Sequence, residues 1–506
     1  MQASAALPCP SSELSRSDRC RQKAARGGAV AGTSGATAAP AVERGTHTKA
    51  DGQPFARPAE LDPRTRMLLE KPIAFLILRL AIPNATVMVV QVLIGLLEVY
   101  FVSRQGVDAL AGVAQVFPLV SLVLAIAQGA TGGGIVTGVA RALGTGRIGA
   151  ASDYAWYAMV LSIPLGLATT AAMSVFGPML YGHMGTSGNS LAIALAYSST
   201  IFAGAILIWT FNLLMAVVRG TGNLQVPVIV VCGGAVILVP LSPALIFGAF
   251  GYPGLGPPGG AVAMLVYYGL GTLAYAAYLW GHFGVLKPAL YLPKLSFEPA
   301  FGILRIGGMS ALVAGSTNLT LAIVTTYVGL GGVEALAGYG AGSRLEFLLV
   351  PLAYGIGGPV GIVVSANLGA GRTERAVKAS WIGVLMASAL TEAIGLAAAA
   401  FPQQWIGIFS QNPTVLHIGA EYLHRVGPLF GFFGLGYVLY CTGQATGRMR
   451  ASVIAALLRA AIAVLGGYAV VWLKLDVSWN FVAVALGMAA FGLFALPALM
   501  ARTGYR

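Results

Sequence analysis

Apolar and polar positions divide the chain into a polar first segment and a long succession of apolar runs. From about residue 73 onward, each run covers about 20 residues or more, which is enough for a helix to cross the hydrocarbon core of a bilayer. Short segments with turn-forming glycine, proline and asparagine separate the runs. The predicted runs are 73–102, 108–134, 150–176, 190–217, 224–248, 259–284, 300–329, 334–366, 376–401, 414–442, 451–473 and 477–501. The pattern predicts an all-α polytopic membrane protein with twelve transmembrane helices.

Residues 1–70 differ from the rest of the chain. They are rich in Ala, Gly, Ser, Pro and Arg and show no apolar periodicity, so we predict a disordered N-terminal tail. This segment has no apolar core of signal-peptide length. A transit peptide is an alternative, although the seven acidic residues of the segment argue against it. A true start near Met67, just before the first span, is a second alternative.

The composition excludes a soluble protein. Of the 506 residues, 57% are hydrophobic and 9% are charged, whereas soluble chains carry about 25% charged residues. The net charge of +13 is distributed over short loops, which argues against a nucleic-acid surface. The four cysteines show neither a zinc spacing nor a CxxC pair, and no Walker-type loop occurs. We therefore expect no cofactor, no metal site and no ATP-driven step.

The basic residues of the short loops predict an orientation. If both termini are cytoplasmic, Arg104 and Lys474 are the only Lys or Arg residues in the loops on the opposite side of the membrane. The cytoplasmic side then holds Arg141, Arg147, Arg219, Lys287, Lys294, Arg372, Arg375, Lys378, Arg448, Arg450, Arg502 and Arg506. Because basic residues collect in cytoplasmic loops, we expect this orientation, in a bacterial inner membrane.

The two halves of the apolar region repeat each other. The matching segments are 106–112 (GVDALAG) with 332–338 (GVEALAG), 143–147 (LGTGR) with 368–372 (LGAGR), and 221–222 (TG) with 446–447 (TG), at offsets of 226, 225 and 225 residues. Six predicted spans lie between equivalent points, so a pseudo-two-fold axis along the membrane normal should relate the halves. We expect an N-terminal six-helix lobe at 71–290 and a C-terminal six-helix lobe at 291–506, which together suit alternating access.

Six motifs carry a family resemblance: 80–84, 91–98, 106–112, 140–147, 219–223 and 340–346. In this order and at this spacing they resemble the multidrug and toxic compound extrusion (MATE) family, nearest to its bacterial DinF-type branch, over about residues 70–500. The resemblance implies cation-coupled export of organic, often cationic and lipophilic, compounds. The implied partners are small organic substrates, a coupling cation and the lipid bilayer, and we expect a monomer.

Glu98 is the first candidate for the coupling site, because charged residues inside membrane spans are costly and mark function. It follows an uncharged run from Leu80 and lies near the outer end of the first predicted span. A carboxyl group removed from water can take up a proton, and the resemblance implies a protonation or cation site here. A glutamate that reaches the outer interface is the structural alternative. Pro83, fifteen residues earlier, predicts a kink that is either static or linked to the state of the carboxylate.

The companions that the resemblance implies around this carboxylate are absent from the sequence. Leu238, Ser242-Pro243 and Met264 stand where the family often has an asparagine, an Asp-Pro pair and a threonine. Few hard oxygen ligands then remain for a sodium ion, so we expect coupling to protons.

The second half offers a candidate polar site of four charged residues inside predicted spans, namely Arg344, Glu346, Glu392 and Arg459. Arg344 and Glu346 are two residues apart and point in different directions on a helix, so each needs a partner on another span. Glu392 and Arg459 are candidate partners. A structural ion-pair network and a proton or substrate site both remain open.

These features favour a secondary active efflux transporter, with proton antiport as the coupling reaction, over an enzyme. A lipid-linked oligosaccharide flippase of the same superfamily is an alternative, but it would need a more cationic cavity. A multi-span enzyme would need a catalytic His or Asp/His pair at a membrane face, and none is evident. A non-transporting scaffold is the third alternative.

Overall fold

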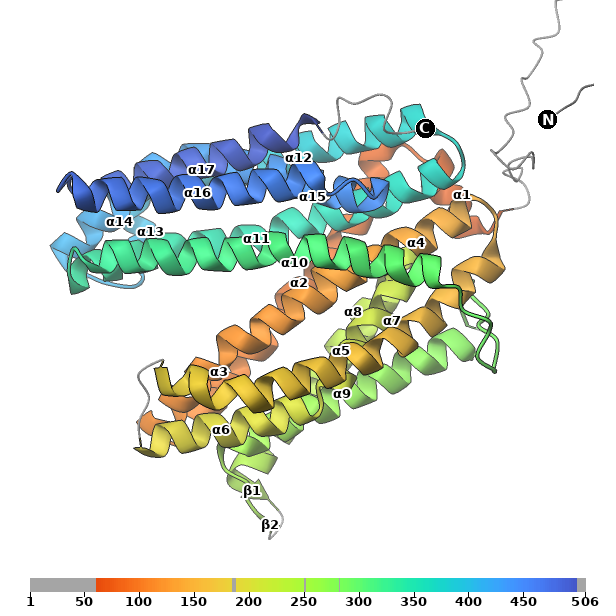
Figure 1. Ribbon diagram of the computed structural model, residues 1–506, viewed down its shortest axis with the longest axis horizontal. Helices are drawn as coiled ribbons and strands as arrows, with labels where there is room; N and C mark the ends of the chain where they lie inside the picture. Colours follow the sequence, from red (N-terminus) through yellow and green to blue (C-terminus); the bar gives the residue numbers. More distant parts are fainter. Residues whose placement is uncertain (1–60, 184–187, 250–251, 282, 498–506) are drawn as a thin grey trace, which may run out of the picture. The chain divides into compact units, whose positions relative to one another are not determined.

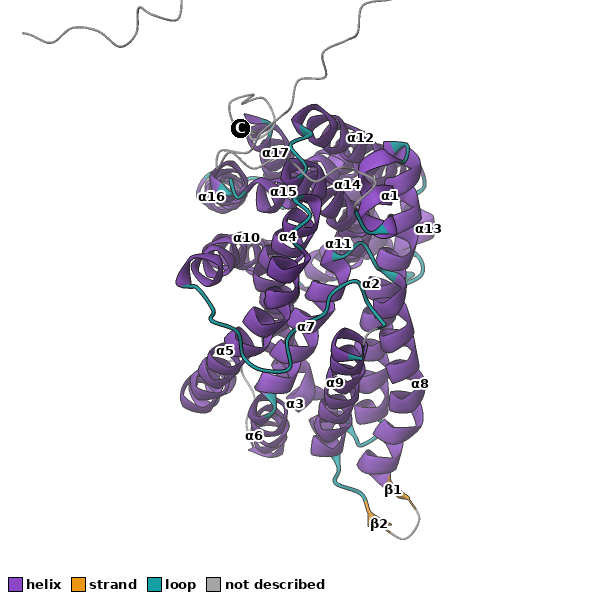
Figure 2. Cartoon of the chain, turned by 90° about the vertical axis from the view of Figure 1, so that its right-hand side faces the viewer, coloured by secondary structure: helices purple, strands orange, loops and turns teal. Residues whose placement is uncertain are grey.

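The computed structural model describes residues 61–183, 188–249, 252–281 and 283–497. Within these ranges the chain is almost entirely helical, as Figure 2 shows. The predicted all-α fold is confirmed. Of the predicted tail, residues 1–60 lie outside the described residues.

The helices of the first half are α1 (Pro63–Glu70), α2 (Ile73–Ser103), α3 (Val107–Ala125), the π-helical η2 (Ile126–Thr131), α4 (Gly132–Gly144), α5 (Ile148–His183), α6 (Gly188–Ala203), α7 (Ala205–Gly220), α8 (Gln225–Phe247) and α9 (Pro257–Trp280). Those of the second half are α10 (Phe297–Gly329), α11 (Val333–Gly369), α12 (Thr373–Ala400), α13 (Pro402–Ile406), α14 (Pro413–Val426), the 3₁₀-helical η3 (Gly427–Leu429), α15 (Phe430–Thr446), α16 (Arg450–Trp472) and α17 (Trp479–Ala495). Two short antiparallel strands, β1 (Gly248–Ala249) and β2 (Tyr252–Pro253), connect α8 and α9. Figure 1 shows α10 to α17 gathered in one group of helices.

Ten helices among the described residues are long and apolar enough to cross a membrane, and an eleventh span results if α6 and α7 are counted together across their 50° bend. In this count α3, η2 and α4 form one span, and so do α14, η3 and α15. The last helix, α17, is apolar but shorter. Each predicted span thus corresponds to a helix or to a run of joined helices. The chain is a multi-pass membrane protein with six such elements in each half.

The repeat seen in the sequence is also present in the backbone. Glycines with positive φ occur in equivalent loops of the two halves, and their angles agree closely: Gly106 (115°) with Gly332 (100°), Gly146 (76°) with Gly371 (72°), and Gly222 (76°) with Gly447 (75°). Because residues with a side chain rarely adopt this conformation, glycine is required at these turns. The matching motifs therefore adopt the same loop geometry in both halves.

The GVDALAG and GVEALAG motifs also have matching contacts. A Cβ atom added to Gly112 would lie 2.7 Å from the carbonyl oxygen of Ser190, and one added to Gly338 would lie 3.0 Å from that of Val415. The first distance is too short for a side chain and the second is tight, so these glycines allow the second and fourth spans of each half to approach closely. The acidic residue of each motif accepts a hydrogen bond from the start of the fourth span of its half. Asp108 accepts from Ser190 (3.1 Å), and Glu334 accepts from Asn412 (3.2 Å).

The end of the predicted tail is ordered into the helix α1. Asp62 caps this helix by accepting a hydrogen bond from the backbone N–H of Arg64 (2.9 Å). Leu68 and Leu69 are completely or almost completely buried. The expectation of disorder therefore does not hold for residues 63–70, because one turn of this short segment is apolar and packs against the helices behind it.

Helix α1 contacts both halves of the molecule. The backbone oxygens of Leu68 and Leu69 accept hydrogen bonds from Asn367 (3.3 Å) and Arg372 (2.8 Å) of the second half. In the first half, the guanidinium group of Arg64 donates to the hydroxyl group of Tyr278 (3.2 Å). This helix therefore connects the two halves at the end of the molecule that carries most of the basic loops.

Deleting residues 2–60 is expected to leave membrane insertion and the melting temperature intact, whereas extending the deletion through residue 70 should lower the melting temperature. Burial of a leucine side chain contributes about 1.5–3 kcal/mol, and the longer deletion removes two. Thermal unfolding of the purified protein measures the effect. Arg66→Ala is the matched control, because its ion pair with Glu70 is largely exposed. An unchanged melting temperature in the longer deletion would contradict a stabilising role for α1.

Hydrogen bonds between the halves concentrate toward one end of the molecule. We call this the basic end, defined by the loops that join α4 to α5, α7 to α8, α9 to α10, α11 to α12 and α15 to α16. Asn84 on α2 donates to the backbone oxygens of Tyr354 (2.9 Å) and Gly355 (3.2 Å) on α11, and Arg141 on α4 donates to that of Ala445 on α15. Among the described residues, no backbone–backbone hydrogen bond joins the halves through the loops of the opposite end. The halves are therefore closed against each other at the basic end.

Candidate functional site

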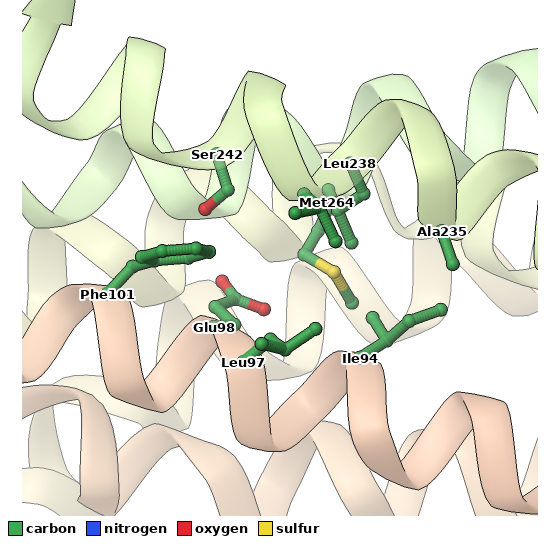
Figure 3. A pocket seen from close by; sticks show the side chains of 9 residues that line it. Ile94, Leu97, Glu98, Phe101, Ala235, Leu238, Ser242 and Met264 are labelled. Atoms are coloured by element: carbon green, nitrogen blue, oxygen red, sulfur yellow. The ribbon is translucent and has the colours of Figure 1, made fainter.

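Glu98 lies in the last third of α2, away from the basic end, and it is 7% exposed. Figure 3 shows its carboxyl group in the space between α2, α8 and α9, which contribute the surrounding side chains. These are Ile94, Leu97, Phe101, Ala235, Leu238, Val239, Ser242 and Met264. The side chains that line this space are thus apolar except for the hydroxyl group of Ser242.

The three positions that the resemblance sets against polar residues all line this space. Leu238 and Ser242 lie on α8, and Met264 lies on α9. The oxygen atom of Ser242 is buried and has no hydrogen-bond partner among the described residues. These three sequence positions therefore lie around Glu98 in space, and two of the three residues, Leu238 and Met264, are apolar.

The hydrogen-bond partner of Glu98 is Tyr197 on α6, whose hydroxyl group donates to carboxyl oxygen Oε1. Tyr197 is buried, with 5% exposure. Gly260 on α9 leaves room for the carboxyl group, since a Cβ atom added there would lie 3.1 Å from Oε1. Among the described residues, no Lys, Arg or His forms an ion pair with Glu98. The site is a buried carboxyl group with a tyrosine donor and no counter-charge.

The set of ligands around Glu98 does not suit a metal ion. Among the described residues, no group of three or more His, Cys, Asp or Glu side chains could hold one. Hard cations take about six or more oxygen ligands, whereas Glu98, Tyr197 and Ser242 supply only four side-chain oxygens here. A proton needs only one acceptor.

Pro83 lies inside α2, next to Asn84 and fifteen residues before Glu98. At 1.5 Å per residue the two positions are about 22 Å apart along the helix axis. Asn84 makes the hydrogen bonds to α11 described above. The proline therefore weakens α2 at the point where this helix is attached to the second half.

In the second half, the structure brings two of the four predicted charged residues together. The guanidinium group of Arg459 on α16 lies 3.5 Å from a carboxyl oxygen of Glu346 on α11. The hydroxyl group of Tyr422 on α14 donates to the other carboxyl oxygen. Arg459 also lies over the rings of Phe433 and Phe491, at 5.7 and 5.9 Å. Glu346 thus has both a cation and a hydrogen-bond donor.

The other two residues of the predicted network lie elsewhere. Arg344 lies over the ring of Phe409 at 4.8 Å, because its position two residues before Glu346 turns it to another side of α11. Glu392 on α12 accepts a hydrogen bond from the backbone N–H of Gly431 (2.7 Å) in the first turn of α15. A carboxylate is favourable at such a helix N-terminus. The four residues therefore do not form one network.

Sequence reasoning missed both tyrosines, although the repeat contained a signal. Tyr197 and Tyr422 are 225 residues apart, which is the offset of the repeat. Each donates to a glutamate, buried Glu98 or partly buried Glu346, but the glutamates occupy different helices of their halves, α2 and α11. The repeat thus marked a tyrosine position that donates to a carboxylate in each half, but not which glutamate it contacts.

Comparisons with known proteins agree with this architecture. The family model described as MatE matches residues 83–244 and 310–469, one segment in each half. The chain is 29% identical over 363 residues to the probable multidrug resistance protein NorM of Thermotoga maritima, covering 71% of this chain and 76% of the relative. It is 26% identical over 408 residues to the FAD transporter of Shewanella oneidensis, covering 79% and 90%, and 22% identical over 400 residues to the multidrug export protein MepA of Staphylococcus aureus, covering 78% and 86%.

Solved structures show the same fold. An outward-facing conformation of a multidrug resistance MATE family transporter superposes with a TM-score of 0.77 at 23% identity and covers 86% of this chain and 96% of its own. Structures of MATE in the straight and the bent conformation both give a TM-score of 0.79, at 23% and 22% identity, and each covers 88% of this chain. They cover 99% and 98% of their own chains. Because the sequence identities are this low, the similarity to these structures shows a shared fold only.

Proposed function

The chain belongs to the MatE family, as its resemblance predicted, and we propose that it exports organic compounds in exchange for protons that bind to Glu98. The family match and the similarity to multidrug efflux proteins support a membrane transporter of this kind. The proposal adds the coupling ion, the residue that binds it and the mechanism of exchange.

The observation that carries the choice of a proton is the environment of Glu98. An ionised carboxylate buried without a counter-charge is strongly disfavoured unless it is neutralised. A bound proton neutralises it, and the hydroxyl group of Tyr197 continues to donate to it. Sodium would need several further oxygen ligands, and the space offers Ser242 among apolar side chains.

We propose alternating access as the mechanism. In this structure the halves are joined at the basic end, through Asn84, Arg141 and α1. For exchange, these contacts would break while contacts at the opposite end form. Pro83 lies beside Asn84 and gives α2 a point where it can bend. A proton that binds to Glu98 would act on the bend at Pro83, because both residues lie on α2.

The proposed transport unit is one chain with a lobe at 71–290 and a lobe at 291–506. The lobes meet in the loop between α9, which ends at Trp280, and α10, which begins at Phe297. A single chain supplies both halves of an alternating-access pathway, so a monomer suffices. The basic loops support an orientation with the basic end in the cytoplasm of a bacterial cell, where the orientation rule places them.

Efflux from proteoliposomes under separate gradients tests the proposal. Ethidium is a suitable cationic probe, because its fluorescence falls when it leaves nucleic acid enclosed in the vesicle. A proton gradient is expected to drive export, a protonophore to stop it, and a sodium gradient alone to have little effect. Export that follows sodium and ignores the protonophore would overturn proton coupling. No export of any cationic or neutral drug probe under either gradient would overturn the proposed function.

A further inference from the structure

We propose that the interface of the two halves at the basic end contains a second binding site, which takes a phosphate or carboxylate group, with Arg219 as its cation. The inference rests on the proposed function, because the site becomes fully accessible when the halves separate. It concerns the class of compound that the protein accepts from the basic end, namely amphiphilic anions in addition to cations.

Arg219 is the starting point because it is a buried cation without an anion. It lies in the last turn of α7 and is 3% exposed. Among the described residues, no carboxylate lies within 4.0 Å of its guanidinium group. Its Nε atom is buried and has no hydrogen-bond partner among them. A buried charge of this kind is unfavourable unless it is paired.

Two neutral groups now contact the guanidinium group. Atom Nη2 donates to the side-chain oxygen of Asn84 (2.6 Å), and the guanidinium carbon lies 5.1 Å from the centre of the Tyr354 ring. An amide oxygen and an aromatic ring carry only partial charges, so they compensate a full charge incompletely. A phosphate or carboxylate would supply the missing charge and could accept from Nε as well.

Three other buried or partly buried arginines, Arg141, Arg372 and Arg459, differ from Arg219 in their partners. Arg141 and Arg372 donate to backbone oxygens at helix C-termini, of Ala445 and Leu69, where the helix dipole favours a cation. Arg459 is paired with Glu346. The environment of Arg219 is therefore not a general feature of buried arginines in this fold.

The space beside Arg219 is lined by polar and apolar side chains and is bounded by backbone on several sides. Gly133, Gly358 and Gly361 line it together with the side chains of Thr137 and Gln444. A Cβ atom added to Gly358 would lie 3.3 Å from Nη2 of Arg219 and 3.0 Å from the amide nitrogen of Asn84. Because Gly358 has no side chain, it leaves this side of the Arg219 guanidinium group without a covering side chain. In the closed state the free space is about the size of one water molecule.

The walls of this space come from both halves, so it widens when the halves part. Arg219, Thr137 and Gly133 belong to the first half, and Tyr354 and Gln444 belong to the second. Opening at the basic end removes the Tyr354 ring from the guanidinium group and leaves a buried cation facing a water-filled opening. Tyr440, which shares a hydrogen bond with Gln444 (2.9 Å), adds an aromatic surface nearby. A compound with an aromatic ring and one anionic group fits both features.

Equilibrium binding of matched aromatic probes tests the inference. The full-length protein is placed in phosphatidylcholine nanodiscs at constant ionic strength and titrated with benzoate, phenyl phosphate and benzamide, the neutral analogue of benzoate. At least one anion is expected to bind about tenfold or more tightly than benzamide, as one charge-assisted hydrogen bond would give. Arg219→Gln should remove the preference, and Arg219→Lys should retain part of it.

Two further variants separate a local site from a general charge effect. Arg448→Gln removes a positive charge from an exposed position at the same end and should keep the preference for anions. Gly358→Ala keeps Arg219 but narrows the space, so it should weaken anion binding even if Arg219→Gln folds poorly. Equal affinity for anions and benzamide in the wild-type protein, or an unchanged preference in Arg219→Gln, would overturn the inference.

A last arm distinguishes a lipid headgroup from a soluble anion. If the occupant is a headgroup, phosphatidylglycerol nanodiscs should weaken binding of the soluble anions to the wild-type protein, and the binding of benzamide should not change. If the occupant is a soluble anion, phosphatidylglycerol should have little effect on the binding of the soluble anions. Either result supports the anion site. Because no gradient is applied, a failure here would leave proton-driven efflux through Glu98 standing, and a failure of efflux would leave anion binding standing.

Discussion

Replacing Glu98 with glutamine is expected to abolish proton-driven efflux while the protein still folds and inserts into the membrane. Glutamine keeps the size of the side chain and can accept the hydrogen bond from Tyr197, but it cannot exchange a proton. The site holds no counter-charge that the substitution would leave unpaired. Ethidium export under a proton gradient should fall to the level of vesicles without protein, and the melting temperature should stay close to that of the wild type.

Two conservative variants test whether the loss is due to proton chemistry. Glu98→Asp keeps a carboxyl group and should retain part of the transport. Tyr197→Phe removes the hydroxyl donor but not the proton acceptor, so it should shift the pH at which export is half-maximal without abolishing export. Glu421→Gln is the matched control, since this carboxylate forms a local, partly exposed pair with Arg425 (3.4 Å) away from Glu98.

Full export by Glu98→Gln under a proton gradient would contradict the assignment of Glu98 as the coupling residue. The coupling site would then belong to the second half, where Glu346 and Glu392 are the buried or partly buried carboxylates that remain. Their different surroundings would separate them, because only Glu346 is paired with an arginine.

The fold could be predicted from the sequence because each span must satisfy its own backbone hydrogen bonds in lipid, so that a long apolar run has few alternatives to a helix. The internal repeat then constrained the arrangement of the spans. The bend between α6 and α7 and the π-helical turn η2 were not predicted, because their residues are as apolar as those of a regular helix. Helix α1 was missed for a different reason: its eight residues are too few to show a periodic pattern.

The candidate site could be predicted only in part. Glu98 stood out because one charge in an apolar span is costly in any arrangement. The partners of charged residues depend on how each helix is rotated about its axis, and apolar spans carry little signal for that rotation. Arg344 and Glu392 therefore pair differently from the prediction, with Phe409 and with the first turn of α15.

The surroundings of the two carboxylates differ between the halves in one charged residue. Arg459 on α16 corresponds, at the offset of 225 residues, to Gly234 on α8. The first half thus lacks an arginine at the position from which the second half neutralises Glu346. One tyrosine is kept in each half, as Tyr197 and Tyr422, but only the second half adds a permanent cation. This asymmetry favours Glu98 as the carboxylate that changes its state of protonation and Glu346 as a structural one.

Arg459→Met is therefore expected to destabilise the protein by about 3–5 kcal/mol, because it leaves Glu346 buried without its cation. The side chains of this pair are 9% and 18% exposed, so water replaces the lost partner poorly. The double variant Arg459→Met, Glu346→Leu should recover much of the loss, since an apolar pair of similar volume needs no compensation. The melting temperature of the purified variants measures the effect. Arg425→Met, which breaks a more exposed pair, should cost no more than about 1 kcal/mol.

Transport by the same variants decides between the two interpretations of Glu346. If the pair is structural, the double variant should export ethidium at a rate close to that of the wild type once the amounts of folded protein are equalised. A double variant that is stable but inactive would show that Glu346 takes part in transport. In that case the arginine would act as an internal substitute for a cationic substrate or a proton, released when one of these binds, and both halves would carry a coupling carboxylate hydrogen-bonded to the same repeated tyrosine.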